Sequence, residues 1–500
     1  MKLLKLFTLF TFLCLVLIQI CHALESEKVG NSESKKYPQE HWYNLNMQGQ
    51  KIGYMRLYLE KAEYQGEEML RSKTDMMMQL KGLGRTMKIE TNRVEYLDAD
   101  LKPRYFVSTS NEIGLKQTEG KIKDGVAYIT TTLNEATTES EIQIPADTIS
   151  DTVAIENLMV KKDLKIGENL KYTTFSFDLL QPIKAEMSVI DEVHYTYQTK
   201  EIPVYVLEQK LEIMGGIITR MWVSDDGTLY KTATDMMGQS YVASKTDRKT
   251  ALGAVEVVDI VLKTRIVPTG KRPKRGAKQF VANVQLTKGE LQKAIVTDNR
   301  QKLELDSERV GTLTIETAGV DEANCPKLPI QDKELQEYLS STVYIESEHP
   351  DIHAKAVEIL DGESNSWQAA KKLSNWVYKS VKEKSLSGGY SSALTTLKTG
   401  SGDCTEHTVL MIAMARSVGI PARICSGIVF MRNAFYYHFW PEVYVGKWAQ
   451  MDPTIGQLVA DANHIQLAGK GLESNTMIEY TEGVFRTLNQ LEIAVVESDK

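Results

Sequence analysis

The sequence predicts an α+β protein of several domains, in which an antiparallel all-β domain precedes a domain of helices packed on a sheet. Three observations support this prediction. The chain has 500 residues, which is too many for one hydrophobic core. Residues 39–265 read as successive strands, and an apolar helix pattern followed by strand patterns lies within 341–500. A stretch rich in proline, glycine and basic residues, 266–279, separates these regions as a linker.

The first 23 residues have the composition of a signal peptide. Lys2 and Lys5 precede an apolar run, and Cys21-His22-Ala23 forms a small-residue cleavage site. Residues 24–38 are polar and charged, as in a disordered leader. Because no later apolar run is long enough to span a bilayer, we expect an exported mature chain, periplasmic or extracellular, without a transmembrane segment.

Composition narrows the class of protein. Hydrophobic residues make up 42% of the chain and charged residues 25%, which is the balance of an ordinary soluble globular protein. The formal net charge of −7 gives no electrostatic reason to expect a nucleic acid partner. No group of Cys and His residues has zinc-ligand spacing, and no EF-hand loop occurs. We therefore predict no metal and no other cofactor.

The cysteines limit the possible disulfides. Cleavage of the signal peptide leaves Cys325, Cys404 and Cys425, an odd number in an oxidising compartment. A Cys325–Cys425 disulfide with Cys404 free is one arrangement that fits this count. Connectivity cannot be deduced from sequence, so the pairing stays open.

Residues 39–265 alternate polar and apolar positions in several runs that are separated by turn signals such as Asp124-Gly125. This pattern predicts a large, curved antiparallel sheet with one covered face. One helix is expected at Asp151–Val160, after the capping residue Ser150. The Tyr-x-Leu-x-x-x-Gly opening of the strands and the Trp222–Thr232 hairpin resemble exported half-barrel domains that carry or contact apolar ligands. The predicted strands are His41–Met47, Gly53–Glu60, Met69–Leu80, Thr86–Tyr96, Val126–Leu133, Val204–Ile213 and Ile217–Val223.

Residues 280–340 predict a small β element, with strands at Phe280–Leu286, Leu303–Leu305 and Gly311–Thr317. Beyond it, apolar residues recur at helical spacing in two segments, 352–360 and 370–381. We expect these two helices to flank a third helix that begins at Cys404.

The third helix is predicted at Cys404–Ser417. Its apolar residues lie almost all round, so we expect it to be buried. Gly419 at the C′ position and Pro421 two residues later end it. A thiol reacts as the thiolate, and its pKa falls at a helix N-terminus and beside a histidine. Cys404 therefore stands where a cysteine nucleophile would be activated.

Three strand patterns follow the helix, at Ile424–Met431, Phe435–Val445 and Trp448–Thr454. The second and third carry His438 and Asp452, and Gly446-Lys447 between them is a hairpin signal.

The register of this hairpin decides whether His438 and Asp452 can meet. Opposed residues share a face, so the loop must have an odd number of residues. The simplest such loop is Val445-Gly446-Lys447, with Tyr444 opposite Trp448. This register places Asp452 diagonal to His438, and a two-residue loop would contradict it.

These blocks resemble the core of the transglutaminase-like superfamily, over residues 340 to 460. The resemblance implies a papain-like thiol acyl transferase that acts on amides, with its Cys-bearing helix packed on an antiparallel sheet. It further implies Cys404 as nucleophile, His438 as general base and then acid, and Asp452 as the residue that holds the imidazole tautomer. The matching motifs are Gly402-Asp403-Cys404-Thr405-Glu406-His407, Ala415-Arg416, Gly419-Ile420-Pro421-Ala422-Arg423, His438-x-Trp440-x-Glu442 and Asp452-Pro453-Thr454.

Three further residues are candidates for supporting roles. The oxyanion hole needs donors, of which the backbone NH of Cys404 is the first and the hydroxyl of Tyr390 a candidate for the second. His407 lies one helical turn from Cys404, and we interpret it as a core or supporting histidine rather than the base. Trp440 is expected either to roof the site or to pack beneath the hairpin.

The residues next to the site carry expectations of their own. Asp403 and Glu406 would raise the pKa of the thiol if both were charged nearby, so we expect one to cap the helix and the other to point away. Pro441 predicts a strand edge or a bulge. Arg416 and Arg423 are expected to be structural ion-pair partners.

The predicted function is exported, thiol-dependent acyl transfer from a peptide or protein amide, with hydrolysis of the peptidase or amidase type through a Cys404 acyl-enzyme. The substrate could belong to the cell envelope. Two alternatives stay open: protein crosslinking by transamidation, and a non-catalytic binding or scaffold protein that uses the β domain. Retention of all cellular function by a Cys404→Ala variant would support the last.

Overall fold

The computed structural model describes residues 37–499 apart from 14 short gaps. The described chain divides mainly into two compact units, with the boundary between Val258 and Asp259. The predicted signal peptide and most of the predicted leader lie outside the described residues. Within the described part, every helix is too short or too polar to cross a membrane. The gaps are 83–84, 100–101, 112–115, 134–135, 150–153, 156–157, 159–163, 177–179, 214–215, 237–238, 260–263, 318, 383–390 and 468–481.

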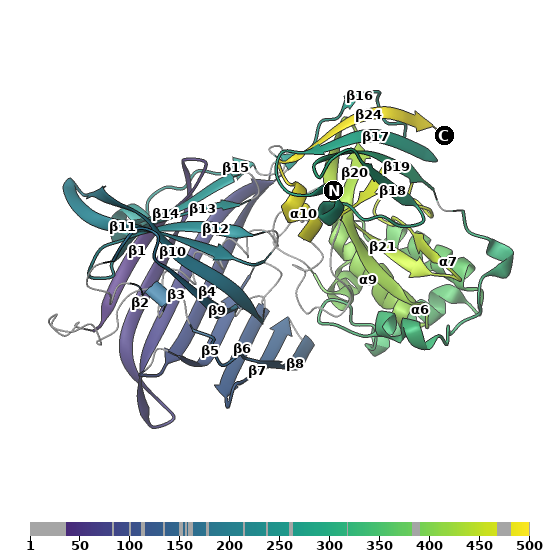
Figure 1. Cartoon of the computed structure of the whole chain (residues 1–500). Helices are drawn as coiled ribbons and strands as arrows, with labels where there is room; N and C mark the ends of the chain where they lie inside the picture. The colour runs from purple at the N-terminus through teal and green to yellow at the C-terminus, as the bar shows by residue number, and fades with distance from the viewer. Residues whose placement is uncertain are drawn as a thin grey trace. The chain divides into compact units, whose positions relative to one another are not determined.

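The N-terminal unit is built on one large sheet (Figure 1). Its order is β8-β7-β6-β5-β4-β3-β2-β1-β14-β13-β12-β11-β10-β9, so two meanders are joined where β1 pairs antiparallel with β14. The predicted large antiparallel sheet is confirmed. The strands are β1 (Gln39–Met47), β2 (Gln50–Tyr64), β3 (Glu67–Gly82), β4 (Arg85–Leu97), β5 (Pro103–Ser110), β6 (Lys116–Lys123), β7 (Val126–Leu133), β8 (Ala136–Gln143), β9 (Asn169–Ser176), β10 (Gln181–Tyr197), β11 (Lys200–Leu211), β12 (Ile217–Val223), β13 (Leu229–Met236) and β14 (Gln239–Thr246), and the short β15 (Val258–Asp259) pairs with β3.

Side-chain alternation explains why one face of this sheet is covered. Along β2, Met55, Leu57 and Leu59 are buried, whereas the residues between them are partly exposed. The turn at Asp124-Gly125 has positive φ at both residues, as a two-residue hairpin requires. Of the helix predicted at Asp151–Val160, the structure describes three residues, which are helical and buried: Ala154, Ile155 and Leu158. The short helix α3 (Arg248–Ala251) follows β14.

The C-terminal unit contains two sheets (Figure 1). The first has the order β16-β24-β17-β19-β18, with β16 (Thr269–Gly270), β17 (Gln279–Leu286), β18 (Gln301–Leu305), β19 (Val310–Glu316) and β24 (Leu491–Asp499). The second has the order β22-β21-β20-β23, with β20 (Ala422–Met431), β21 (Ala434–Tyr444), β22 (Trp448–Gln450) and β23 (His464–Gln466).

Residues 266–279, expected to form a linker, are tied to this unit. β16 pairs parallel with β24, and the backbone NH of Gly276 donates to Asp461 over 2.9 Å. β24, near the C-terminus, lies between β16 and β17 and so completes the small sheet.

Helix α9 (Cys404–Ser417) is the centre of the unit and is buried along almost its whole length. It packs on β20 and β21 and contacts the helices α6 and α7, which confirms the two flanking helices that the sequence predicts. The other helices are α5 (Leu291–Ala294), η2 (Glu322–Asn324), η3 (Lys333–Leu339), α6 (Pro350–Leu360), α7 (Ser366–Ser380), α8 (Ala393–Thr399) and α10 (Glu482–Thr487).

Candidate active site

Cys404 is the first residue of α9 and is 1% exposed. Asp403 is the N-cap, and its carboxylate accepts from the backbone NH of Thr405 over 2.9 Å. The helix runs to Ser417, and Gly419 after it has φ +82°, so both predicted ends are confirmed. Local capping signals alone therefore fix where the nucleophile candidate stands.

The prediction that one of the two acids points away is wrong. Glu406 turns back to accept from the backbone NH of Asp403 (2.8 Å), so the two acids together form a capping box. Its other oxygen accepts from the backbone NH of Ser391 over 2.9 Å. Burial, and then the neighbouring Asp403, raise the pKa of Glu406 well above its usual value. This upward shift disfavours the charged form of Glu406 and so reduces its electrostatic penalty on a thiolate at Cys404.

The hairpin that carries His438 has the predicted register. Tyr444 lies opposite Trp448, and Gln450 lies opposite Glu442, so the loop has three residues. The third strand is shorter than predicted because pairing ends at Gln450, and Asp452 lies just beyond it in a bridge with Gln457.

The irregularity expected at Pro441 is absent on the β20 side. β21 pairs with β20 without a register shift, and Pro441 lies opposite Ile424. Its carbonyl accepts from Met451, just past the end of β22. The missing NH of proline is tolerated because regular pairing with β22 has already ended there.

His438 and Asp452 meet as the register predicts. Nε2 of His438 lies 2.7 Å from Oδ2 of Asp452, and both side chains are essentially inaccessible. The other oxygen, Oδ1, accepts from the backbone NH of Thr454 over 2.9 Å. Burial would raise the pKa of Asp452, but the two histidines beside it outweigh burial and lower that pKa. An ionised Asp452 accepts from Nε2 of His438, so Nδ1 is the ring nitrogen that would serve a nucleophile.

A second histidine, His464, which was not among the predicted site residues, contacts the same carboxylate. Its Nε2 lies 3.1 Å from Oδ2 of Asp452, and its Nδ1 lies 3.0 Å from Oδ1 of Asp461. The spacing Asp461-x-x-His464 shortly after Asp452 was the signal that could have drawn attention to the pair.

Gly427 makes the approach of the two histidines possible. On β20 it lies between His438 of β21 and Gln466 of β23, on the same face as His464. A Cβ atom there would lie 2.0 Å from the carbonyl oxygen of Ile465 and 2.6 Å from the ring of Trp440. Only glycine therefore fits beneath the cluster.

Trp440 packs inside the unit, beside both histidine rings. Its ring centroid is 6.0 Å from that of His438 in a stacked arrangement and 5.1 Å from that of His464 edge-on. Its Nε1 donates to Gln450 over 3.0 Å. Full burial matches the expectation that Trp440 packs beneath the hairpin rather than roofing an open site.

The other predicted residues have varied outcomes. Tyr390 lies outside the described residues. His407 is buried, and its Nδ1 donates to the carbonyl of Asp403, because a carbonyl can only accept. Arg423 pairs with Glu442 over 2.6 Å as expected. Arg416 donates to the carbonyl oxygens of Ala422 and Ser340.

In the described chain, Cys325, Cys404 and Cys425 form no disulfide with one another. Cys425 is buried on β20 against Trp440, and Cys325 follows η2 with its thiol donating to the carbonyl of Asp321 over 3.2 Å. The Cys325–Cys425 pairing is therefore wrong.

A cation could be considered at one place among the described residues. The ligand atoms of His438, Asp452 and His464 lie within 4.8 Å of one another. Ligands around a tetrahedral zinc would be separated by about 3.3 Å, given metal–ligand distances of about 2.0–2.2 Å. Oδ2 of Asp452 instead lies at hydrogen-bond distance from both nitrogens. We interpret the group as hydrogen-bonded, and a cation would have to replace both bonds.

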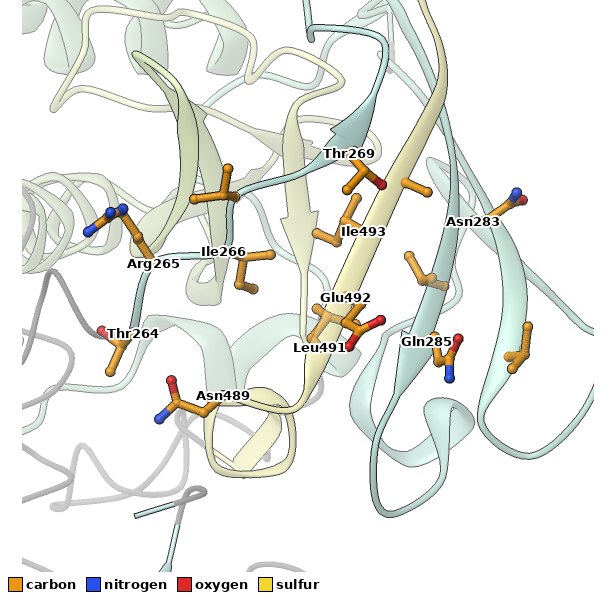
Figure 2. A pocket seen from close by; sticks show the side chains of 14 residues that line it. Thr264, Arg265, Ile266, Thr269, Asn283, Gln285, Asn489, Leu491, Glu492 and Ile493 are labelled. Carbon is orange, nitrogen blue, oxygen red and sulfur yellow. The ribbon is translucent and has the colours of Figure 1, made fainter. Parts of the chain in front are cut away.

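A pocket of about 440 Å³ lies elsewhere in the unit, against β24 and β17 (Figure 2). Arg265, Asn489 and Glu492 supply polar groups to it, and Ile266 and Leu491 supply apolar surface. None of the candidate catalytic residues lines it.

Residues 353–453 match the model of the transglutaminase-like superfamily. The chain therefore contains a transglutaminase-like domain, as its motifs indicated. No curated protein matches the chain.

Three solved structures are similar to parts of the chain. A candidate cysteine protease from Cytophaga hutchinsonii shares 16% identity over 47% of this chain and 89% of its own, with a TM-score of 0.31. A β-barrel-like protein from Brucella abortus, a domain of unknown function, shares 12% identity over 42% of this chain and 96% of its own, with a TM-score of 0.33. A candidate protease from Parabacteroides distasonis shares 10% identity over 77% of this chain and 63% of its own, with a TM-score of 0.18.

Proposed function

We propose that Cys404, His438 and Asp452 catalyse thiol-dependent acyl transfer from a peptide or protein amide, with water as the acceptor. A hydrolase or acyltransferase of this general kind agrees with the transglutaminase-like domain. The observation that carries the proposal is the buried 2.7 Å contact between His438 and Asp452. His438 lies on β21, against which the helix of Cys404 packs. A carboxylate at Nε2 orients the ring so that Nδ1 can exchange a proton with a thiol.

In the proposed first step, the Cys404 thiolate attacks the amide carbonyl, and the carbonyl oxygen becomes an oxyanion. The backbone NH of Cys404, the first residue of α9, is the first donor to it, and Tyr390 is retained as the second. The C–N bond then breaks, and His438 gives its proton to the departing amine. A thioester remains on Cys404.

In the second step, His438 removes a proton from water, which attacks the thioester. The C–S bond breaks, the product leaves as a carboxylic acid that loses its proton to solvent, and the thiolate and imidazolium pair is restored. An amine in place of water would give a new amide, which is the crosslinking alternative. Ammonia release with amine incorporation distinguishes crosslinking, whereas hydrolysis forms new carboxylates only.

Export through the first 23 residues is part of the proposal, and a cell-envelope peptide would then be available as substrate. The rival function is binding or scaffolding through the β unit. A Cys404→Ala variant that keeps all cellular function would favour that rival.

Alkylation by iodoacetamide tests the proposed site without a substrate. Cys404 is expected to react well below pH 8.5, the approximate pKa of an ordinary thiol, and to lose this reactivity in His438→Ala. Cys425 and Cys325 are internal controls, because burial raises the pKa of both thiols. Peptide mass spectrometry reads each cysteine separately between about pH 5 and pH 9. An inert Cys404 in both proteins would refute the proposal.

A further inference from the structure

Asp452 has a second histidine partner, which the proposed catalytic steps do not use. The Nε2 atoms of His438 and His464 lie 2.7 Å and 3.1 Å from the same oxygen, Oδ2 of Asp452. The far side of the His464 ring faces Asp461, with Nδ1 3.0 Å from Oδ1 and 3.2 Å from the backbone carbonyl oxygen. His464 and Asp452 are 0% exposed and Asp461 is 7% exposed. The four side chains therefore form one buried row, which we call the His438–Asp461 row.

Hydrogen-bond chemistry fixes the protonation of His464. Carboxylate and carbonyl oxygens only accept, so each ring nitrogen of His464 must carry a proton. Both acids are ionised: the histidines lower the pKa of Asp452 against the effect of burial, and His464 lowers that of Asp461 to about 2 although burial opposes it. Burial likewise opposes the charged form of His464, but the two carboxylates outweigh it and raise its pKa.

A cationic ring at His464 offsets part of the negative charge of the two carboxylates beside it. Asp452 and Asp461 face its two nitrogens, and the ring centroid of His438 is 6.2 Å away. Arg300 donates to the backbone carbonyl oxygens of His464 (2.8 Å) and Asp461 (2.6 Å). A cationic His464 thus places a positive charge between two buried carboxylates, and Arg300, which also interacts with Asp298 and Glu442, adds part of a second. A neutral His464 would leave more buried negative charge uncompensated.

We propose that His464 is a positioning residue that stays protonated at working pH, holds the carboxylate of Asp452 in place and offsets part of its negative charge. The proposal builds on the function proposed for Cys404 and His438. Because one oxygen serves two imidazole rings, the attraction of Asp452 for a protonated His438 is shared. His438 then loses its proton at a lower pH than it would if Asp452 were bonded to His438 alone. This is the proton that His438 gives to the departing amine.

Nitrogen NMR of the histidine rings in the full-length chain tests the charge directly and needs no substrate. We expect His464 to keep both ring nitrogens protonated between about pH 6 and about pH 8, in addition to the imidazolium that the proposed function gives to His438, whereas an ordinary histidine loses its proton near pH 6.5. Its signals should disappear in His464→Gln, which assigns them. A His464 that titrates near pH 6.5, or that is neutral throughout, would overturn the inference.

A matched pair of variants tests the positioning role. Gln places its amide NH₂ near the position of Nε2 and keeps the bond to Asp452 without the charge. Asn places its NH₂ near Nδ1 and keeps only the contact with Asp461. We expect His464→Gln to retain kcat/KM within about tenfold and to move the alkaline limb of the pH profile upward by on the order of one unit. His464→Asn should lose on the order of 10–100-fold in kcat.

The outcomes separate the two proposals. Equal losses in the two variants with an unmoved alkaline limb would show a merely structural role and overturn the inference. A cationic His464 beside a Cys404 that reacts only at alkaline pH would refute the proposed function while supporting the charge assignment. Conversely, a reactive, His438-dependent Cys404 beside a neutral His464 would support the proposed function alone.

Discussion

Asp452 accepts a 2.7 Å hydrogen bond from His438 although it lies beyond the last residue of β22. Two features bring them together. The three-residue loop gives both residues the same parity, and the backbone NH of Met451 continues the pairing by donating to Pro441. The turn after Asp452 then supplies the NH of Thr454, which holds the second carboxylate oxygen. The contact therefore depends on the hairpin register and on the turn.

Replacing Asp452 with Asn should lower kcat by on the order of 10³–10⁴-fold with little change in fold. The amide keeps the volume but loses the charge. Its NH₂ group would face either both imidazole NH groups or the backbone NH of Thr454, so neither orientation keeps all the contacts that hold the ring of His438 in its reactive tautomer. Steady-state kinetics on a peptide amide measures the effect, and circular dichroism checks folding. Activity near that of the wild type in a folded Asp452→Asn protein would remove Asp452 from the mechanism.

As pH rises from about 4.5 towards 8, the wild type should lose stability relative to the Glu406→Gln variant. The folded-state pKa of Glu406 is raised, so its contribution is fully present below the unfolded value of 4.5 and is lost as pH rises through the folded pKa. Gln cannot ionise, and its loss of one hydrogen bond, on the order of 1–3 kcal/mol, does not depend on pH. Thermal unfolding measured across this range gives the slope. A difference that stays constant, or that moves against the variant, would show that Glu406 ionises normally.

Gly427→Ala should destabilise the C-terminal unit by about 1–3 kcal/mol. The new methyl group would lie 2.0 Å from the carbonyl oxygen of Ile465 and would push β23, and with it His464, away from β20. Denaturant unfolding measures the loss, and kinetics should show a fall in kcat as well.

Gly289→Ala is the matched control for this substitution. Gly289 has φ +88° with no atom near the position of a Cβ, so its replacement costs only the left-handed backbone conformation, about 1–2 kcal/mol. A Gly427→Ala protein with unchanged kcat would mean that the position of His464 does not matter for activity.

Removal of divalent cations should leave kcat/KM unchanged. The atoms of His438, Asp452 and His464 that could bind a cation are hydrogen-bonded to one another, and a metal would break both bonds. The measurement compares activity before and after dialysis against EDTA, with elemental analysis of the protein. Loss of activity on dialysis that returns with zinc alone would replace the hydrogen-bonded row by a metal site.

The sequence by itself determined the parts of the site that depend on neighbouring residues. The cap at Asp403 and the stop at Gly419 determined the ends of α9, because capping is satisfied within one turn. Loop parity determined the register of β21 and β22, since side chains alternate strictly along strands. Alternation also predicted the large sheet of the N-terminal unit.

Only the tertiary structure decided which distant segments join these elements. β23 has three residues, too few for any periodicity, yet its pairing with β20 brings His464 to Asp452. β24 completes the small sheet from the other end of the unit. Cys425 on β20 and Glu406 on α9 are buried by packing that their own sequence neighbours do not encode. The physical reason is that these contacts come from long-range pairing and burial, which select among many short segments of similar local preference.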